Sequence, residues 1–352
     1  MAQSETLDKA VLDVFVKWLQ SKKSEGTARH RKTHVNKFRQ WLVAQDRPSL
    51  LSASSLDVED HFEAIRETHP DTTATSRLSA ISTFYTWLMD EDTPERLSRE
   101  GIDGIEQPTS NPAKGLLSNY EDIDFGSKKS KIYDRDIIAL KRDEASELVD
   151  RENVPEPKTR NQLLLKLLLQ TGIRAEEARR IKLSDITTPE EATKESERRR
   201  IRIDSVKNKP RRTVFYQPSL DEILSRWVNK LRKVYAPAKE SPYLFVSNRS
   251  EQLSYTALRE TVYQAAENAG IQEKMYVDAS GNPRWKVSPH TLRHTMARFA
   301  VTGDERIDIS RLARLMGHFD KEGNPNIETT QKYLSFCEQD LKNASSACIP
   351  NI

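Results

Sequence analysis

The chain has 352 residues, enough for two domains that each bury a core, and its composition is polar, with 31% charged and 36% hydrophobic residues. No apolar run approaches a membrane span, and the start MAQSETLDKA lacks a signal peptide's basic and apolar regions, so we expect a cytoplasmic protein. Two cysteines, Cys337 and Cys348, are too few for a disulfide framework or a zinc site and are expected to be free thiols.

Positive charge is concentrated locally, although the formal net charge is only +3. Residues 22–39 (KKSEGTARHRKTHVNKFR) contain one acidic residue, and residues 198–212 are basic again. Such patches are typical of nucleic-acid binding, and the alternative is a solvated helix face with a charged hairpin. The candidate nucleic-acid contacts are Arg29, Arg31, Lys32, Lys37 and Arg212.

The first 90 residues have the apolar spacing of helices. The predicted helices are VLDVFVKWLQ (11–20), TARHRKTHVNKFRQWLVAQ (27–45), SSLDVEDHFEAIRE (54–67) and SRLSAISTFYTWLMDE (76–91). In the first of them Val11, Phe15 and Trp18 fall on one side. These stripes predict the core of a small helical bundle.

The helical pattern ends near Asp92, and a polar stretch with prolines at 94, 108 and 112 runs to about Arg135. This composition predicts an extended linker at a domain junction. We therefore expect an N-terminal helical domain over 1–112, a linker over 113–138 and a second domain over 139–352.

The second domain is predicted to be helical around one β-hairpin. A helix is expected in KRDEASELVDREN from 141, and NQLLLKLLLQ (161–170) is apolar nearly all round, as in a buried central helix. The runs RRRIRIDSV and TVFYQ, joined by the turn KNKPR, predict the hairpin. The rest, from Pro218 to Leu341, is expected to be mainly helical. The expected fold is mainly α with a small β-hairpin.

Arg174 follows a glycine that can end the buried helix. Gly172 is a plausible left-handed cap, and Arg174 then opens a helix whose free backbone donors add to its guanidinium. This arrangement suits a phosphate, and Glu177, one turn on, can hold an arginine in place. The alternative is a surface arginine balanced by Glu176 and Glu177.

Two histidines and a second arginine lie near helix ends. Ser288 and Pro289 predict an N-cap and first helical residue, so His290 and Arg293, three apart, share a helix face, which His294 can also share. His318 follows Gly317 at the end of an apolar helical pattern. Each histidine has a purely structural alternative.

Lys207 and Tyr333 are ordinary when taken alone. Lys207 lies at the hairpin tip, where an exposed lysine is usual. Tyr333 lies in ETTQKYLSF, where it could equally be a core aromatic residue.

In order, these segments resemble the catalytic domain of the tyrosine recombinases, the phage integrase or Xer-like family. TGIRAEE resembles the family's TGxRxxE box, HTLRH its HxLRH box, LMGH its LGH box and TTQKY its TTQxY run, while VKNKPRRTV resembles its hairpin with lysine and arginine five apart. The resemblance extends over roughly 140–340. The N-terminal part resembles the family's helical, SAM-like core-binding domain through ISTFYTWL and the NPA at Asn111.

The chain departs from the family pattern between His318 and Tyr333, where the gap is several residues longer than usual. The extra EGNPNI reads as a loop, and loops accept insertions at little cost. Tyr255, Tyr263 and Tyr276 precede the histidine–arginine box and fit the pattern worse.

The resemblance implies that the protein cleaves DNA by attack of Tyr333 on a backbone phosphorus, which forms a 3′-phosphotyrosine and releases a 5′-hydroxyl. It assigns the non-bridging oxygens to Arg174 and Arg293, and protonation of the leaving oxygen to Lys207. His290 would accept or orient the tyrosine proton, His318 would hydrogen-bond the phosphate, and Glu177 would support the site. No metal or cofactor is expected.

The implied partner is double-stranded DNA, bound by a homo-tetramer on paired sites, with a monomer or dimer off DNA and a nucleoid location. The segment after Tyr333 is long enough to pass to a neighbouring subunit, and the alternative is packing on its own domain. Two other functions stay open. One is a type IB topoisomerase, and the other is a DNA-binding regulator that has lost the chemistry.

Overall fold

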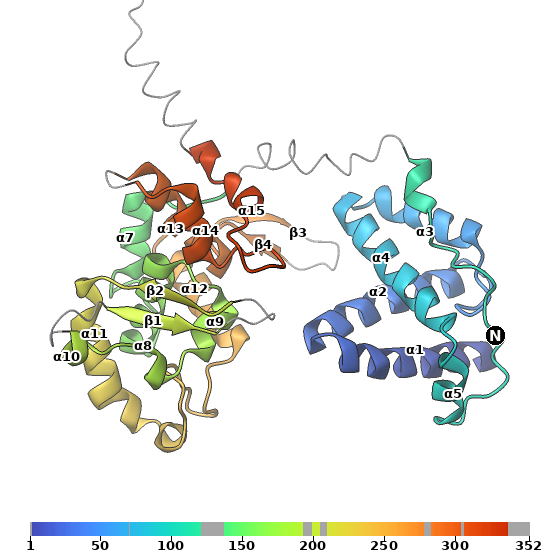
Figure 1. Ribbon diagram of the computed structural model, residues 1–352, viewed down its shortest axis with the longest axis horizontal. Coiled ribbons are helices and arrows are strands. Elements are labelled where there is room, and N and C mark those ends of the chain that lie inside the picture. Colours follow the sequence, from blue (N-terminus) through green and yellow to red (C-terminus); the bar gives the residue numbers. More distant parts are fainter. Residues whose placement is uncertain are drawn as a thin grey trace, which may run out of the picture. The chain divides into compact units, whose positions relative to one another are not determined.

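The computed structural model describes residues 2–69, 71–120, 137–192, 199–204, 210–277, 283–303 and 306–336. The chain divides into two compact units, Met1–Phe125 and Gly126–Ile352 (Figure 1). Lys207, both cysteines and the segment proposed for exchange between subunits lie outside the described residues. None of the helices in the described ranges is long and apolar enough to cross a membrane.

The first unit is a helical bundle, and the four predicted helices are confirmed. Its elements are α1 (Ala2–Lys22), α2 (Glu25–Ala44), α3 (Ser55–Arg66), α4 (Asp71–Leu88), α5 (Thr93–Ser98) and the 3-10 turn η1 (Leu116–Asn119). Ser24 caps α2, and Ser54 with Asp57 forms a capping box on α3. The core is aromatic, with Phe15 against Phe84 and Trp87.

The segment from Thr93 to Tyr120, which we expect to be extended, instead packs on this bundle. Leu97 and Leu116 are buried in the bundle core. Asn111, in the NPA segment, donates hydrogen bonds from its amide to the Ser82 carbonyl and the Thr86 hydroxyl of α4. Isolated apolar residues among prolines give no periodic signal, so a sequence pattern does not reveal this packing.

The second unit surrounds one buried helix, as expected for 161–170. Its helices are α7 (Arg142–Val149), α8 (Lys158–Thr171), α9 (Ala175–Arg180), α10 (Pro189–Ala192), α11 (Asp221–Arg226), α12 (Tyr255–Asn268), α13 (Pro289–Thr302), α14 (Ile309–Met316) and α15 (Ile327–Gln331). Short turns are η2 (Leu183–Asp185), η3 (Pro218–Leu220), the π-helical η4 (Trp227–Leu231), η5 (Arg232–Val234) and η6 (Ala236–Lys239). All the leucines of α8 except the partly buried Leu169 are buried.

The predicted hairpin is confirmed, and a second hairpin lies in the region that is expected to be mainly helical. Strands β1 (Arg200–Ile203) and β2 (Arg212–Phe215) pair antiparallel, with Ile201 opposite Val214 and both buried. Strands β3 (Lys274–Val277) and β4 (Pro283–Trp285) form the second pair. Unlike β1, the segments KMYV and PRW do not alternate apolar and polar residues, so their sequences do not indicate strands.

Glycine is required where α8 ends. Gly172 has a φ of 61°, which confirms the predicted left-handed cap, and its N–H bonds the Leu168 carbonyl. A Cβ at Gly172 would also collide with the Met296 side chain of α13. Glycine therefore lets the chain turn from α8 toward Arg174 without backbone strain and without displacing the end of the Met296 side chain.

Alanine at Gly172 should destabilise the fold by more than alanine at a matched glycine. Gly270 also has a positive φ, 67°, but nothing lies within 4 Å of its added Cβ. Gly270→Ala should therefore lower the free energy of unfolding by about 1–2 kcal/mol, the cost of a left-handed residue with a side chain. Gly172→Ala should cost more because Met296 must move. Chemical denaturation of the whole chain measures both, and equal losses would contradict this steric account.

Candidate active site

Four separate segments of the second unit carry the predicted catalytic residues that lie within the described ranges, all of them except Lys207. They are the start of α9 with Arg174, helix α13, the end of α14 with His318, and the turn after α15 with Tyr333. In Figure 1, α13, α14 and α15 gather next to one another, near β2. Ser288 caps α13 with Thr291, as predicted, and Gly317 ends α14 with a φ of 64°.

Arg293 lies at the centre of this cluster and is 2% exposed. One Nη1 hydrogen bond of 2.6 Å goes to the Gly172 carbonyl, and Nη2 donates to the Met316 carbonyl and lies 3.0 Å from His318 Nε2. Burial, followed by the charge of Arg174, lowers the pKa of Arg293 to about 9, so it stays a cation at neutral pH. Among the described residues, carbonyls and an imidazole accept its hydrogen bonds, and no carboxylate forms an ion pair with it.

The contacts of His318 fix its tautomer. Arg293 can only donate, so His318 Nε2 must accept, and Nδ1 then carries the proton. Nδ1 lies 2.9 Å from the Thr330 hydroxyl, which itself donates to the Asn326 carbonyl at 2.8 Å. His318 is therefore held as a neutral imidazole.

Glu177 lies beneath the site and binds two arginines. Its carboxylate accepts two bonds from Arg212, of 2.8 and 2.7 Å, and contacts Arg174 through the backbone N–H at 2.8 Å and Nη1 at 3.3 Å. Burial favours the neutral acid, but the bonds and charge of Arg212 outweigh it and lower the pKa of Glu177. The predicted pairing of Glu177 with an arginine thus links β2 to α9.

Arg212 is buried, whereas a residue that contacts DNA is expected on the surface. It is 8% exposed, its Nη atoms bind Glu177, and Nε donates to the Leu315 carbonyl at 2.9 Å. A Cβ on Gly317 would lie 2.7 Å from this guanidinium. Arg212 would have to abandon a buried carboxylate to reach DNA, so its position argues against the expected contact and for a supporting role.

Arg174 and Arg293 approach the same atom. Arg174 Nη1 lies 3.5 Å from the Met316 carbonyl oxygen, to which Arg293 Nη2 also donates. The Arg174 side chain is 42% exposed, so this guanidinium is open to a ligand from solvent. Two cations that meet at one acceptor, one buried and one accessible, form a suitable place for an anionic group.

Tyr333 is fully buried, yet its hydroxyl lies in the polar cluster. The phenol oxygen is 2.9 Å from His294 Nδ1, and the ring is parallel to that of His318, with centroids 6.4 Å apart. Burial raises the pKa of Tyr333 to about 12, although Arg293 and Arg174 oppose this. The side chain is thus both a core aromatic residue and a neighbour of the two arginines.

His290 is placed differently from its expected role beside the tyrosine. It is exposed on α13, and its ring meets that of His294 edge-on at 4.3 Å. Although one side is open, the protein packed on its other side and the charges of Lys332, Arg293 and Arg174 lower the pKa of His290 to about 4. His294 is the histidine that meets the hydroxyl. The sequence signal for this residue is its position four residues after His290, which places both histidines on the same face of the helix.

The long gap before Tyr333 forms a loop that closes on itself. Phe319 and Pro325 make an antiparallel bridge, and the Asp320 N–H donates to the Asn324 carbonyl at 2.9 Å. The Asn326 N–H then donates to the His318 carbonyl at 2.7 Å. The chain therefore leaves His318 and returns beside it before α15 begins, and Tyr333 stays in the cluster.

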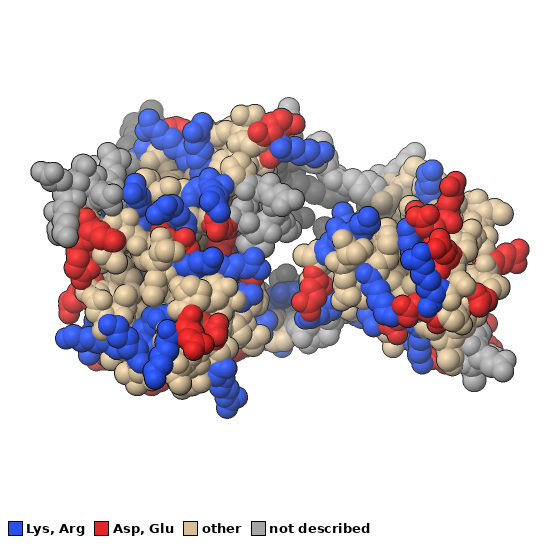
Figure 2. Space-filling view, turned by 60° about the horizontal axis from the view of Figure 1, so that its bottom comes forward, with Lys and Arg blue, Asp and Glu red and all other residues tan. Residues whose placement is uncertain are grey.

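The basic residues of α2 are partly engaged within the first unit. Arg29 pairs with Glu25 at 2.6 Å and Lys32 with Asp13 at 2.8 Å, and both are exposed. Arg31 donates to the Ser79 carbonyl and contacts the Thr83 hydroxyl of α4, and Lys37 is half-buried. On the face in Figure 2, lysines and arginines lie among acidic residues on both units. Arg29 and Lys32 are thus the more accessible candidates.

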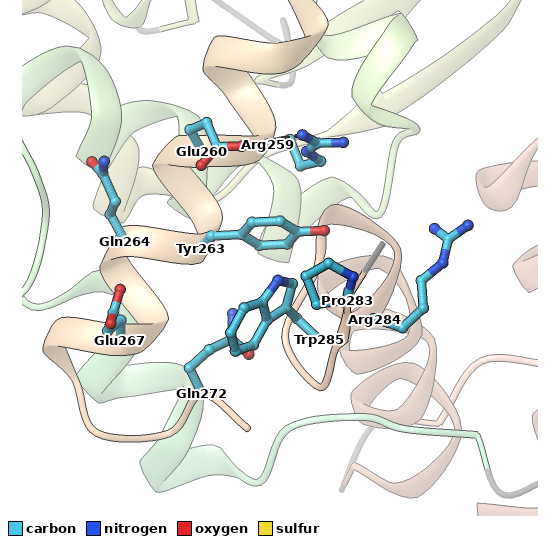
Figure 3. Close-up of a pocket in the computed structure, with 9 residues that line it drawn as sticks. All are labelled: Arg259, Glu260, Tyr263, Gln264, Glu267, Gln272, Pro283, Arg284 and Trp285. Carbon is cyan, nitrogen blue, oxygen red and sulfur yellow. Dashed lines mark hydrogen bonds and ion pairs between the residues drawn. The ribbon is translucent and has the colours of Figure 1, made fainter. Parts of the chain in front are cut away.

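A pocket of about 560 Å³ lies between α12 and β4, outside the predicted site. In Figure 3 the rings of Tyr263 and Trp285 line its wall, with centroids 6.3 Å apart. The Arg259 guanidinium lies 5.6 Å from the Tyr263 ring centre. The pocket is not predicted from the sequence because one of its walls, β4, is not predicted.

In the described ranges, no group of three side chains is arranged to hold a metal ion.

Glu177→Gln should destabilise the protein by about 3–5 kcal/mol, because Arg212 would lose its buried charge partner. Glu176→Gln is the matched control, since Glu176 pairs with Arg179 and Arg180 at a partly exposed position and should cost less than about 1 kcal/mol. The folded-state pKa of Glu177 is lowered, so its contribution is complete above its ordinary pKa of 4.5 and is lost as the pH falls through the folded value. Urea denaturation should show the two variants converging in acid, and a constant difference would contradict the ion pair.

Comparison with known proteins supports the family predicted from the motifs. The phage integrase family matches residues 139–338, and its N-terminal SAM-like domain matches residues 12–92. Tyrosine recombinase XerC of Bifidobacterium longum (strain DJO10A) is 26% identical over 235 residues, which cover 64% of this chain and 58% of the relative. Tyrosine recombinase XerA of Pyrococcus furiosus is 30% identical over 210 residues, 58% of this chain and 60% of the relative. The chain thus spans less than two thirds of these relatives.

Solved structures confirm the predicted fold class. XerH site-specific recombinase bound to palindromic difH substrate, a post-cleavage complex, has a TM-score of 0.63 at 18% identity and covers 95% of this chain and 83% of its own. A lambda integrase dimer bound to a COC′ core site has a TM-score of 0.53 at 15% identity, covering 92% and 76%. At such identities the likeness concerns the fold alone. The family match covers more than half of the chain, from α7 to beyond Tyr333, and the chain therefore belongs to the phage integrase family.

Proposed function

We propose that the protein is a site-specific recombinase that cleaves and rejoins duplex DNA through a covalent bond to Tyr333. The observation that carries this proposal is the meeting of Arg174 and Arg293 at one acceptor, with the Tyr333 hydroxyl in the same cluster. The printed names of the relatives support it, since they are tyrosine recombinases.

In the proposed reaction the two arginines hold the non-bridging oxygens of the scissile phosphate. The exposed Arg174 makes the first contact, and the phosphate then competes with the Met316 carbonyl for Arg293. Negative charge grows on these oxygens in the transition state, where guanidinium groups fixed in advance stabilise it most. Two such groups can supply the charge stabilisation that metal ions give in other phosphoryl transfers, so the proposed chemistry uses no metal and no cofactor.

Tyr333 then forms the bond to phosphorus. The Tyr333 oxygen–phosphorus bond forms as the bond from phosphorus to the 5′ oxygen breaks, which leaves a 3′-phosphotyrosine and a 5′-hydroxyl. Lys207 is proposed, from its sequence position alone, to give the 5′ oxygen its proton. The reverse attack by a 5′-hydroxyl restores the tyrosine and rejoins the strand.

The histidines have distinct proposed tasks. His290, on the open side of α13, is proposed to accept or relay the proton released in the attack. His318 is proposed to hydrogen-bond the phosphate. Its Nε2 accepts from Arg293 in the DNA-free structure, so donation to a phosphate requires a proton at Nε2. DNA binding should therefore change the protonation or tautomer of His318.

We further propose that the region 1–112 binds duplex DNA, that 113–138 is the connection, and that 139–352 is the catalytic region. Assembly as a homo-tetramer on paired sites and a cytoplasmic, nucleoid-associated location belong to the same proposal. The solved complexes with DNA are of proteins with this fold, which supports duplex DNA as the partner.

Replacing Tyr333 by Phe should abolish covalent capture of DNA. The substrate is a nicked suicide duplex carrying a site selected from random duplexes by binding to the full chain, and the readout is a shifted band on a denaturing gel. Tyr255→Phe and Tyr263→Phe are matched controls, since these tyrosines are the rejected candidates. Adducts that persist in Tyr333→Phe would show that the nucleophile is misassigned. Salt-sensitive binding without adducts in the parent protein would favour a regulator.

Replacement of Arg29 and Lys32 by Gln should weaken DNA binding uniformly across sequences. Each cation that neutralises one phosphate contributes about one unit to the slope of log affinity against log salt concentration. The double variant should therefore lower the slope by roughly two units. Lys17→Gln, on α1 and paired with Glu100, is the control and should leave the slope unchanged. Fluorescence anisotropy over a salt series measures this, and an unchanged slope in the double variant would place the contacts elsewhere.

A further inference from the structure

His294 makes a contact that the proposed reaction does not yet use. Its Nδ1 lies 2.9 Å from the Tyr333 hydroxyl oxygen, and both side chains are buried. His294 follows Arg293 directly on α13, so one helix turn carries a phosphate-binding candidate and a contact to the candidate nucleophile. The neighbouring His290 points to the open side of the same helix.

The neutral state of His294 allows its ring to accept this hydrogen bond. Burial, followed by the charges of His290, Lys332 and Arg293, lowers the pKa of His294 to about 3, so the imidazole is neutral. A neutral imidazole has one nitrogen that accepts, so the Tyr333 hydroxyl can donate its hydrogen to His294 Nδ1. This requires the tautomer of His294 with its proton on Nε2.

We propose that His294 is a positioning residue for the nucleophile, which fixes the place and orientation of the Tyr333 hydroxyl by accepting its hydrogen. This inference rests on the proposed function, since it concerns the reacting oxygen of that chemistry. With His294 as acceptor, the oxygen is held by the helix that also carries the phosphate-binding guanidinium of Arg293.

A matched pair of variants separates positioning from packing. His294→Phe keeps a ring of similar size and removes the acceptor, whereas His294→Asn places an amide oxygen near the position of Nδ1. His294→Phe should slow adduct formation at saturating suicide duplex by about 10- to 100-fold, the effect of a misplaced reacting group, with DNA affinity unchanged. His294→Asn should recover most of that rate. A rate for His294→Phe equal to the parent, or equally slow rates in both variants with intact folding, would overturn the proposal.

A measurement without DNA tests the contact independently of any activity. In the ¹⁵N NMR spectrum of the DNA-free full chain, His294 should show the tautomer protonated at Nε2, and Tyr333→Phe should shift its Nδ1 resonance. A proton on Nδ1, or no response to Tyr333→Phe, would overturn the inference. If the NMR signature is present but the parent protein forms no adduct, the proposed function is wrong, whereas the hydrogen bond between Tyr333 and His294 is still supported.

Discussion

The active-site cluster depends on one buried carboxylate. Glu177 joins the Arg212 guanidinium of β2 to the backbone and side chain of Arg174 at the start of α9, and Arg212 in turn binds the carbonyl of Leu315 near the end of α14. Three elements distant in sequence are thereby joined by charged hydrogen bonds to a buried carboxylate and a buried guanidinium. Such a network is costly to break, because each partner would remain buried and unpaired.

Arg293 is held by neutral hydrogen-bond acceptors, whereas Arg212 is held by a carboxylate. Its donors go to two carbonyls and one imidazole, which satisfy its hydrogen bonds but do not cancel its charge. The positive charge thus remains available to an anion while the guanidinium is fixed. Glu177, by contrast, pairs with Arg212 through two hydrogen bonds and also contacts Arg174. The cluster thus contains one buried arginine paired with a carboxylate, and two arginines, one accessible and one buried, that approach the same acceptor.

Much of this arrangement could be predicted from the sequence, and the misses have physical reasons. Gly172, Ser288 and Gly317 have local signatures that depend only on neighbouring residues, so their caps were predicted correctly. The partner of the Tyr333 hydroxyl was not, because His290 and His294 lie on one helix face and only tertiary packing decides which turns inward. The buried position of Arg212 could not be foreseen for a similar reason. Arg212 lies in a basic stretch, and nothing in that stretch indicates that it will be buried in an ion pair with Glu177, 35 positions earlier.

The closed loop between Phe319 and Asn326 has a consequence for how such proteins are recognised. Its backbone bonds join the two ends of the loop, so residues added between them leave the ends where they are. Catalytic geometry is then independent of the number of residues separating the last histidine from the tyrosine. A fixed spacing between these two residues is therefore a poor criterion for finding homologues, and the order of the residues is a better one.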